Sequence, residues 1–148
     1  MPTTRRSRVL AAPPGIVWRT VGDPTQLPRW WPKVVRVEGA DARGFTEVLA
    51  TERGRSVRAD FVVLERRAGE LLRFRQEVEG TPFERILSSA ETEVRVDGAG
   101  DGASRVTLEQ RQRLRGVAAL GGFLVRRATR RILDGALDGL EEVHGRAA

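Results

Sequence analysis

The sequence predicts an α+β domain in which an antiparallel sheet of about seven strands is followed by one long C-terminal helix. Residues 33–116 show strand-like patterning interrupted by glycine-bearing turns. Residues 117–144 instead place apolar side chains at helical spacing. The length of 148 residues suffices for one substantial core, so we expect a single domain over residues 1–148.

The N-terminal part predicts one strand and two short helices. Alternating side chains indicate a strand over residues 4–11. Prolines 13 and 14 suit the start of a helix, and helical spacing continues from Ile16 as far as Gly22. Asp23 is suited to cap a second helix beginning at Pro24, and Gln26 occupies the position of a capping-box partner.

Six further strands are expected between Lys33 and Gly116. Their connections are tight, which favours an antiparallel meander over units with crossover helices. The glycine-rich stretch 98–102 lies between two of these strands and no helix follows it, so it indicates a hairpin turn and not a phosphate loop. The expected strands cover residues 34–38, 45–52, 57–65, 71–79, 85–96 and 105–114.

The last predicted element is a long helix beginning at Val117. Gly121, Gly122, Gly135 and Gly139 each weaken such a helix by about 1 kcal/mol relative to alanine, so they indicate close packing or a bend. Four arginines are expected on a solvated face, with Arg130 pairing to Asp134. The apolar stripe consists of Leu120, Leu124, Ala128, Ile132, Ala136, Leu140 and Val143, and the arginines are Arg126, Arg127, Arg130 and Arg131.

Charge and composition restrict the classes of function. The net charge of +6 comes from arginine, since Lys33 is the only lysine, and basic residues are not interleaved with stacking aromatics as in proteins that bind nucleic acid. No apolar run is long enough to span a bilayer, and the N-terminus lacks the apolar region of a secretory signal. We therefore expect a cytoplasmic protein without nucleic acid, integral membrane segment or cofactor. The absence of cysteine and the single histidine predict no metal site.

A family resemblance is carried by residues 11–38, "AAPPGIVWRTVGDPTQLPRWWPKVVRVE". This stretch, together with the predicted order of elements, resembles the START and pollen-allergen-like helix-grip proteins of the SRPBCC superfamily, especially the polyketide cyclase/dehydrase-like branch. The resemblance implies that the curved sheet wraps around the long helix. It also implies a cavity between sheet and helix whose usual guest is a hydrophobic small molecule.

The inner face of the predicted sheet carries polar side chains among apolar ones. By alternation, Gln76 shares a face with Phe74, and Gln110 and Gln112 share a face with Leu108. An unpartnered buried amide costs about 1–3 kcal/mol, which favours a cavity that holds water or a ligand. Alternatively, these amides lie near strand ends, bond to one another or face solvent. The predicted ligand-binding residues are Trp30, Trp31, Phe61, Phe74, Gln76, Ser88, Gln110, Gln112 and Phe123.

The adjacent tryptophans Trp30 and Trp31 lie between Pro28 and Pro32, which restrict the backbone. In a helix-grip domain, one indole is expected to face inward and the other to cover the seam or the mouth. They either fill the core or offer a ligand a flat apolar wall and an N–H donor. Both interpretations are kept.

Catalysis has little support in the sequence, and whether the protein is an enzyme is left open. His144 lies near the C-terminus, and no motif surrounds Ser88. Glu47 and Asp60 could pair across neighbouring strands or bind Arg58, and no charged residue is clearly assigned to the inner face. These observations favour binding over turnover, and the resemblance then implies a lipid, polyketide or isoprenoid as the ligand. The alternatives are a polyketide cyclase or aromatase using the same cavity, and a membrane-surface or protein-interaction module using the arginines; a homodimer is left open.

Overall fold

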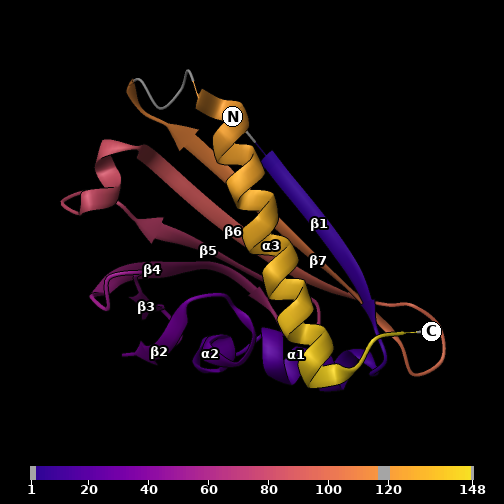
Figure 1. Ribbon diagram of the computed structural model, residues 1–148. Coiled ribbons are helices and arrows are strands. Elements are labelled where there is room, and N and C mark those ends of the chain that lie inside the picture. The colour runs from indigo at the N-terminus through magenta and orange to yellow at the C-terminus, as the bar shows by residue number, and fades with distance from the viewer. Residues whose placement is uncertain (1–2, 117–120, 148) are drawn as a thin grey trace.

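The computed structural model describes residues 3–116 and 121–147 and contains a long helix packed across one face of a curved sheet (Figure 1). The strands are β1 (Thr3–Leu10), β2 (Val34–Glu38), β3 (Gly44–Ala50), β4 (Ser56–Arg67), β5 (Leu71–Glu77), β6 (Leu87–Gly98) and β7 (Ser104–Leu114). The helices are α1 (Pro14–Val21), α2 (Leu27–Trp30) and α3 (Gly122–His144), and the 3-10 turns are η1 (Pro24–Gln26) and η2 (Pro82–Arg85).

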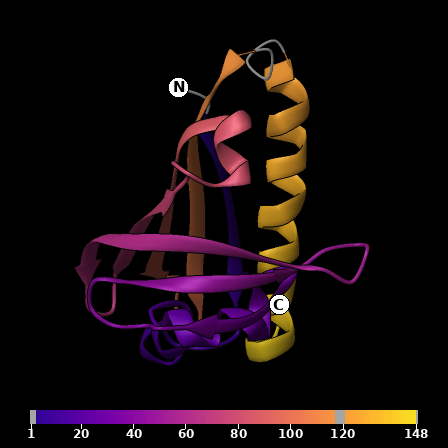
Figure 2. The ribbon, with the colours of Figure 1, turned by 90° about the vertical axis from the view of Figure 1, so that its left-hand side faces the viewer.

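All seven strands form one antiparallel sheet in the order β1-β7-β6-β5-β4-β3-β2. The first strand therefore lies at one edge and the second at the other, and α1, η1 and α2 carry the chain between them. Figure 2 shows α3 along one side of the sheet, with its C-terminal end beside the N-terminal helices. The predicted α+β architecture is confirmed. No helix of the described segments combines the length and apolar character needed to span a membrane.

Several boundaries differ from those expected. Arg85 and Ile86 are not part of a strand, because Pro82 begins the η2 turn that precedes β6. Ile86 consequently lies outside the sheet and has 52% of its surface exposed. The last helix is described from Gly122, whereas the predicted start at Val117 and the stripe residue Leu120 lie outside the described residues.

The face of the sheet that α3 covers, called here the inner face, holds the main core. Leu133, Leu137 and Leu140 of α3 are fully buried and belong to the same apolar cluster as Val94 and Leu108 of the central strands. Alternate residues of three strands belong to this cluster, as the period of a strand requires: Leu72 and Phe74, Val94 and Val96, and Val106 and Leu108. The core is therefore centred on the second half of α3.

Two glycines of α3 allow α2 and the residues that follow it to lie close to α3. A Cβ atom added at Gly139 would lie 2.4 Å from the carbonyl oxygen of Trp30, and one added at Gly135 would lie 3.0 Å from Cγ of Pro32. At Gly122, by contrast, an added Cβ would meet nothing within 4 Å. Close packing therefore explains the glycines of the second half of the helix.

Local hydrogen bonds confirm the predicted helix cap at Asp23 but not the predicted capping box at Gln26. The Asp23 carboxylate accepts a hydrogen bond from the backbone N–H of Thr25 at 3.0 Å, as a cap of η1 should. Gln26 does not complete a capping box, because its side-chain oxygen accepts a hydrogen bond from Arg29 at 2.8 Å.

The predicted pair of Arg130 with Asp134 is also wrong. Asp134 instead accepts a hydrogen bond from Nε of Arg6 on β1 at 2.8 Å. Arg8, two residues farther along the same strand, lies 3.1 Å from Glu141. The acidic second half of α3 thus faces the basic edge strand, an arrangement that joins residues more than a hundred positions apart in the chain.

Candidate functional site

Three phenylalanines form an aromatic cluster on the inner face. The ring centroid of Phe45 lies 5.1 Å from that of Phe61 and 5.2 Å from that of Phe74, and the last two are 5.4 Å apart. Phe45 and Phe74 are buried, whereas Phe61 is only partly buried against the core. The cluster supplies an apolar wall with one accessible ring.

The three predicted glutamines lie on the inner face, but two of them have partners within the protein. Gln110 donates a hydrogen bond to the Thr92 hydroxyl at 3.1 Å, and Gln112 accepts one from the Thr129 hydroxyl of α3 at 3.0 Å. Gln76, paired across strands with Phe61, is half-buried. Because the amides of Gln110 and Gln112 have hydrogen-bond partners, they give no argument for a cavity. The pairs instead link the sheet to itself and to the helix.

The adjacent tryptophans differ in burial. Trp30 is 3% exposed and belongs to the core cluster, while Trp31 is half-buried and packs against that cluster. Their rings meet edge to face, with centroids 5.4 Å apart. The Nε1 donor of Trp30 is buried and has no hydrogen-bond acceptor among the described residues. A buried donor without an acceptor carries an energetic cost that a ligand oxygen or a water molecule could relieve.

Glu47 is the inner-face residue that the sequence interpretation missed. It has only 5% of its surface exposed, alternates with Phe45 and Leu49, and lies across from Val37 and Ala59. No ion pair or hydrogen bond involves its carboxyl group within the described residues. Burial raises the pKa of Glu47 from 4.5 to about 8. At neutral pH this side chain is therefore mainly a neutral acid that can donate a hydrogen bond.

The suggested pairing of Glu47 with Asp60 is wrong. The strand register places Ala59 opposite Glu47 and places Asp60 opposite Thr46, so the two carboxyl groups lie on opposite faces. The Asp60 carboxylate accepts a hydrogen bond from the Thr46 hydroxyl. Arg58 binds neither acid, because its partner is Glu38 at 2.9 Å.

The remaining predicted residues lie apart from this group. The Ser88 hydroxyl donates a hydrogen bond to the Arg113 carbonyl at 3.3 Å, beside a register shift between Leu87 and Ser89. Phe123 is 68% exposed and lines a hollow next to β1 that does not include the aromatic cluster. The structure thus brings together Phe61, Phe74, Gln76, Gln110 and Gln112, and places Ser88 and Phe123 elsewhere.

His144 is engaged in packing at the end of α3. Its Nε2 atom lies 2.8 Å from the Thr20 hydroxyl of α1. Burial, and to a smaller extent the charge of Arg29, lower the pKa of His144. Among residues 3–116 and 121–147, no group of three histidine or carboxylate side chains is placed to hold a metal ion.

Comparison with known proteins agrees with the fold. A Thermus thermophilus protein is 25% identical, with a TM-score of 0.74 and 95% of each chain covered. A START superfamily protein from Mycobacterium smegmatis is 11% identical, with a TM-score of 0.79 and 96% of each chain covered.

The third similar structure is BexL, a di-domain aromatase/cyclase of the BE-7585A biosynthetic pathway. It is 21% identical with a TM-score of 0.79, and the match covers 96% of this chain but 46% of BexL. This chain therefore spans less than half of that protein. A search of curated protein sequences gave no significant match. The family model for polyketide cyclase/dehydrase and lipid transport proteins matches residues 1–145, and the chain belongs to this family.

Proposed function

We propose that the protein binds a hydrophobic or amphipathic small molecule against the inner face of the sheet, beneath the first half of α3. The family includes lipid transport proteins as well as cyclases and dehydrases, which supports a guest with substantial apolar surface. The aromatic cluster offers a wall for that surface. The half-buried amide of Gln76 offers a polar contact.

The observation that carries this proposal is the change in burial along α3. Thr129, Leu133, Leu137 and Leu140 are buried against the sheet. Arg126, two turns before Leu133, is instead exposed and lines a hollow next to β1. The helix therefore closes on the sheet from Thr129 onward and stands clear of it nearer its start.

The part of the inner face next to the start of the helix remains accessible. Gln76, Ala90 and Gln112 are only half-buried there, and Ile132 on the flank of α3 is 42% exposed. A mixture of apolar surface and a few placed polar groups is typical of small-molecule sites. An amphipathic guest would cover the apolar part and satisfy the polar groups.

The test is native mass spectrometry of protein purified from its host, followed by titration with 2-naphthol and with palmitate. The variant Ala90→Trp fills space on the inner face of β6. The variant Arg113→Trp adds the same ring on the exposed outer side of β7 and serves as the matched control. We expect the wild type and Arg113→Trp to carry a co-purified ligand or to bind one of the two probes. Ala90→Trp should carry no ligand and bind neither probe.

Two results would overturn the proposal. One is a wild-type protein that carries no additional mass and binds neither probe. The other is an Ala90→Trp variant that is folded by circular dichroism and binds as well as Arg113→Trp. A preference for 2-naphthol would indicate an aromatic guest, and a preference for palmitate would indicate an acyl chain.

A second candidate function, cyclase-like turnover of a linear poly-ketone, is supported by Glu47. A neutral carboxylic acid on the same face as the phenylalanine cluster could act as general acid toward a ketone oxygen, because its pKa of about 8 lies near the operating pH. We expect Glu47→Gln to bind 2-naphthol like the wild type. With a linear poly-ketone, however, this variant should give the same products as form without any protein. If Glu47→Gln gives the same products as the wild type, a role of Glu47 as general acid is excluded.

A further inference from the structure

A basic hollow lies at the edge of the inner face, at the seam between edge strand β1 and the first half of α3. Its volume is about 510 Å³, which is within the range of small-molecule sites and larger than a bare inorganic phosphate needs. We call this hollow the β1–α3 groove. It is lined by Thr3, Thr4, Arg5, Arg6, Phe123, Arg126 and Arg130.

The charges of the groove are only partly balanced. Arg5 contacts Glu109 at 3.1 Å and Arg6 contacts Asp134 at 2.8 Å, so each has a carboxylate partner. Arg126 and Arg130 form no ion pair with the residues that the structure describes. The lining itself contains four arginines and no acidic residue. About two positive charges therefore remain available to a ligand.

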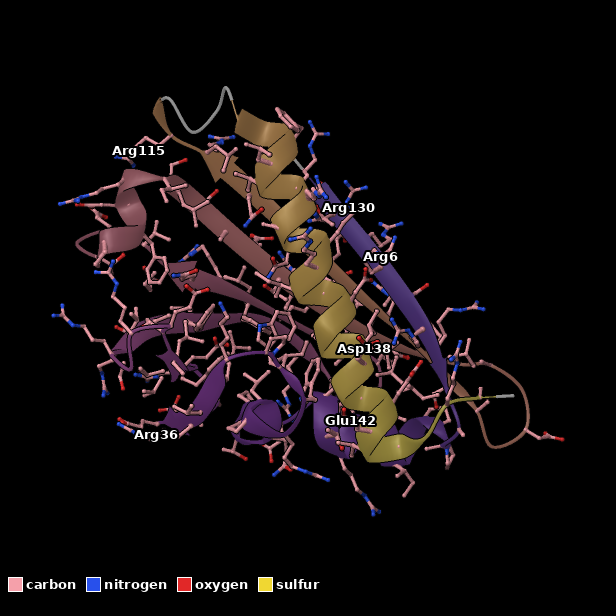
Figure 3. The ribbon with its side chains drawn as sticks, in the orientation of Figure 1. Arg6, Arg36, Arg115, Arg130, Asp138 and Glu142 are labelled. Atoms are coloured by element: carbon pink, nitrogen blue, oxygen red, sulfur yellow. The ribbon has the colours of Figure 1, made fainter. Side chains whose placement is uncertain are left out.

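The positions of these arginines make them converge. Arg126 and Arg130 are four residues apart and therefore lie one above the other on the same side of α3. Figure 3 shows Arg130 on the side of the helix that faces β1, near Arg6. The ion pair with Asp134 holds Arg6 at the end of this row. Guanidinium groups arranged in this way suit the geometry of phosphate oxygens.

Phe123 adds an apolar surface to the groove. Its side chain is 68% exposed, although large apolar side chains are normally covered. It lies three residues before Arg126, on the neighbouring turn of the helix. A ligand that combines a dianionic group with an apolar or planar portion would cover Phe123 and neutralise the two arginines together.

From these contacts we infer that the β1–α3 groove binds an organic phosphate monoester, with the phosphate on Arg126 and Arg130 and the organic portion on Phe123. The inference does not depend on the proposed inner-face guest, because the two sites use different side chains. Ala90→Trp should leave the groove intact, and changes at Arg126 and Arg130 should leave binding of 2-naphthol intact. The two proposals can therefore fail separately.

The test uses isothermal titration of the full chain with phenyl phosphate at low and at physiological ionic strength. The variant Arg126→Gln/Arg130→Gln removes both unbalanced charges. The control Arg127→Gln/Arg131→Gln makes the same change in net charge on exposed residues of the same helix, rotated by about 100° from the groove. We expect the first variant to weaken binding about tenfold or more and the control to stay within about twofold of wild type.

Two further arms identify the organic portion and the source of the phosphate. Phe123→Ala should reduce affinity for phenyl phosphate to that for inorganic phosphate. Vesicles of phosphatidylcholine with and without phosphatidic acid test a lipid headgroup against a free ester. Loss of vesicle binding only in Arg126→Gln/Arg130→Gln would support the site and assign it to the lipid.

The inference is overturned if wild type binds neither phenyl phosphate nor phosphatidic acid vesicles. It is equally overturned if the two double variants lose affinity to the same extent. That result would mean that net charge alone attracts the anion.

Discussion

Replacing Glu47 with glutamine is expected to stabilise the protein at neutral pH and to remove part of the pH dependence of its stability. Burial raises the pKa of this acid from 4.5 to about 8, whereas in the unfolded chain it has its ordinary value. Between these two pH values the unfolded chain loses the proton and the folded chain keeps it. The contribution of Glu47 to stability is therefore complete below pH 4.5 and is lost progressively as the pH rises to about 8.

The size of the effect follows from linkage. Each pKa unit corresponds to about 1.4 kcal/mol, so the cost at pH 7 is about 3 kcal/mol. We expect Glu47→Gln to raise the free energy of unfolding by up to about this amount at pH 7 and to have little effect at pH 4. Urea unfolding from pH 4 to pH 8 measures this difference.

The matched control is Glu79→Gln, which changes an exposed carboxylate. Its stability should follow the wild type across the pH range. A Glu47→Gln variant whose stability stays parallel to the wild type from pH 4 to pH 8 would contradict the burial of a neutral acid at this position.

Gly139→Ala is expected to destabilise the protein, although alanine favours helices. The new Cβ atom would lie 2.4 Å from the Trp30 carbonyl oxygen and 2.9 Å from its Cα atom. These are backbone atoms, so no side-chain rotation relieves the overlap. The gain in helix propensity is about 1 kcal/mol, whereas overpacking of this kind costs about 3 kcal/mol. We expect a net loss of about 2 kcal/mol.

Thermal and urea unfolding of Gly139→Ala and of Gly122→Ala test this packing. Gly122 lies in the same helix, and an added Cβ atom there meets nothing within 4 Å. Gly122→Ala should be neutral or slightly stabilising. Equal stability of the two variants would show that α2 and α3 are not in close contact at Gly139.

The strands could be predicted because turn glycines separate them clearly. Gly39, Gly54, Gly69 and Gly80 all have positive φ, the conformation that glycine adopts most easily, and each lies in a turn between alternating segments. Patterning could not show that Ile86 leaves the sheet, because Pro82 stands three residues before the expected strand and starts a turn of its own.

The candidate site could be predicted only in part. Alternation correctly placed Gln76, Gln110 and Gln112 on the inner face, since strand parity alone decides this. It could not supply the partners Thr92 and Thr129, which depend on register and on the position of α3. Glu47 was missed because both faces of β3 carry apolar residues. Its shared parity with Phe45 was the signal that could have identified it.

The pairing of β1 with β7 has a consequence for how the chain reaches its native state. Thr3 lies opposite Arg111, so the two partners are joined only after most of the chain is available. Strands β2 to β7 pair with their sequence neighbours. High contact order at one edge makes closure of that edge slow compared with hairpin formation. During synthesis on the ribosome, β1 therefore has no partner strand until β7 has emerged.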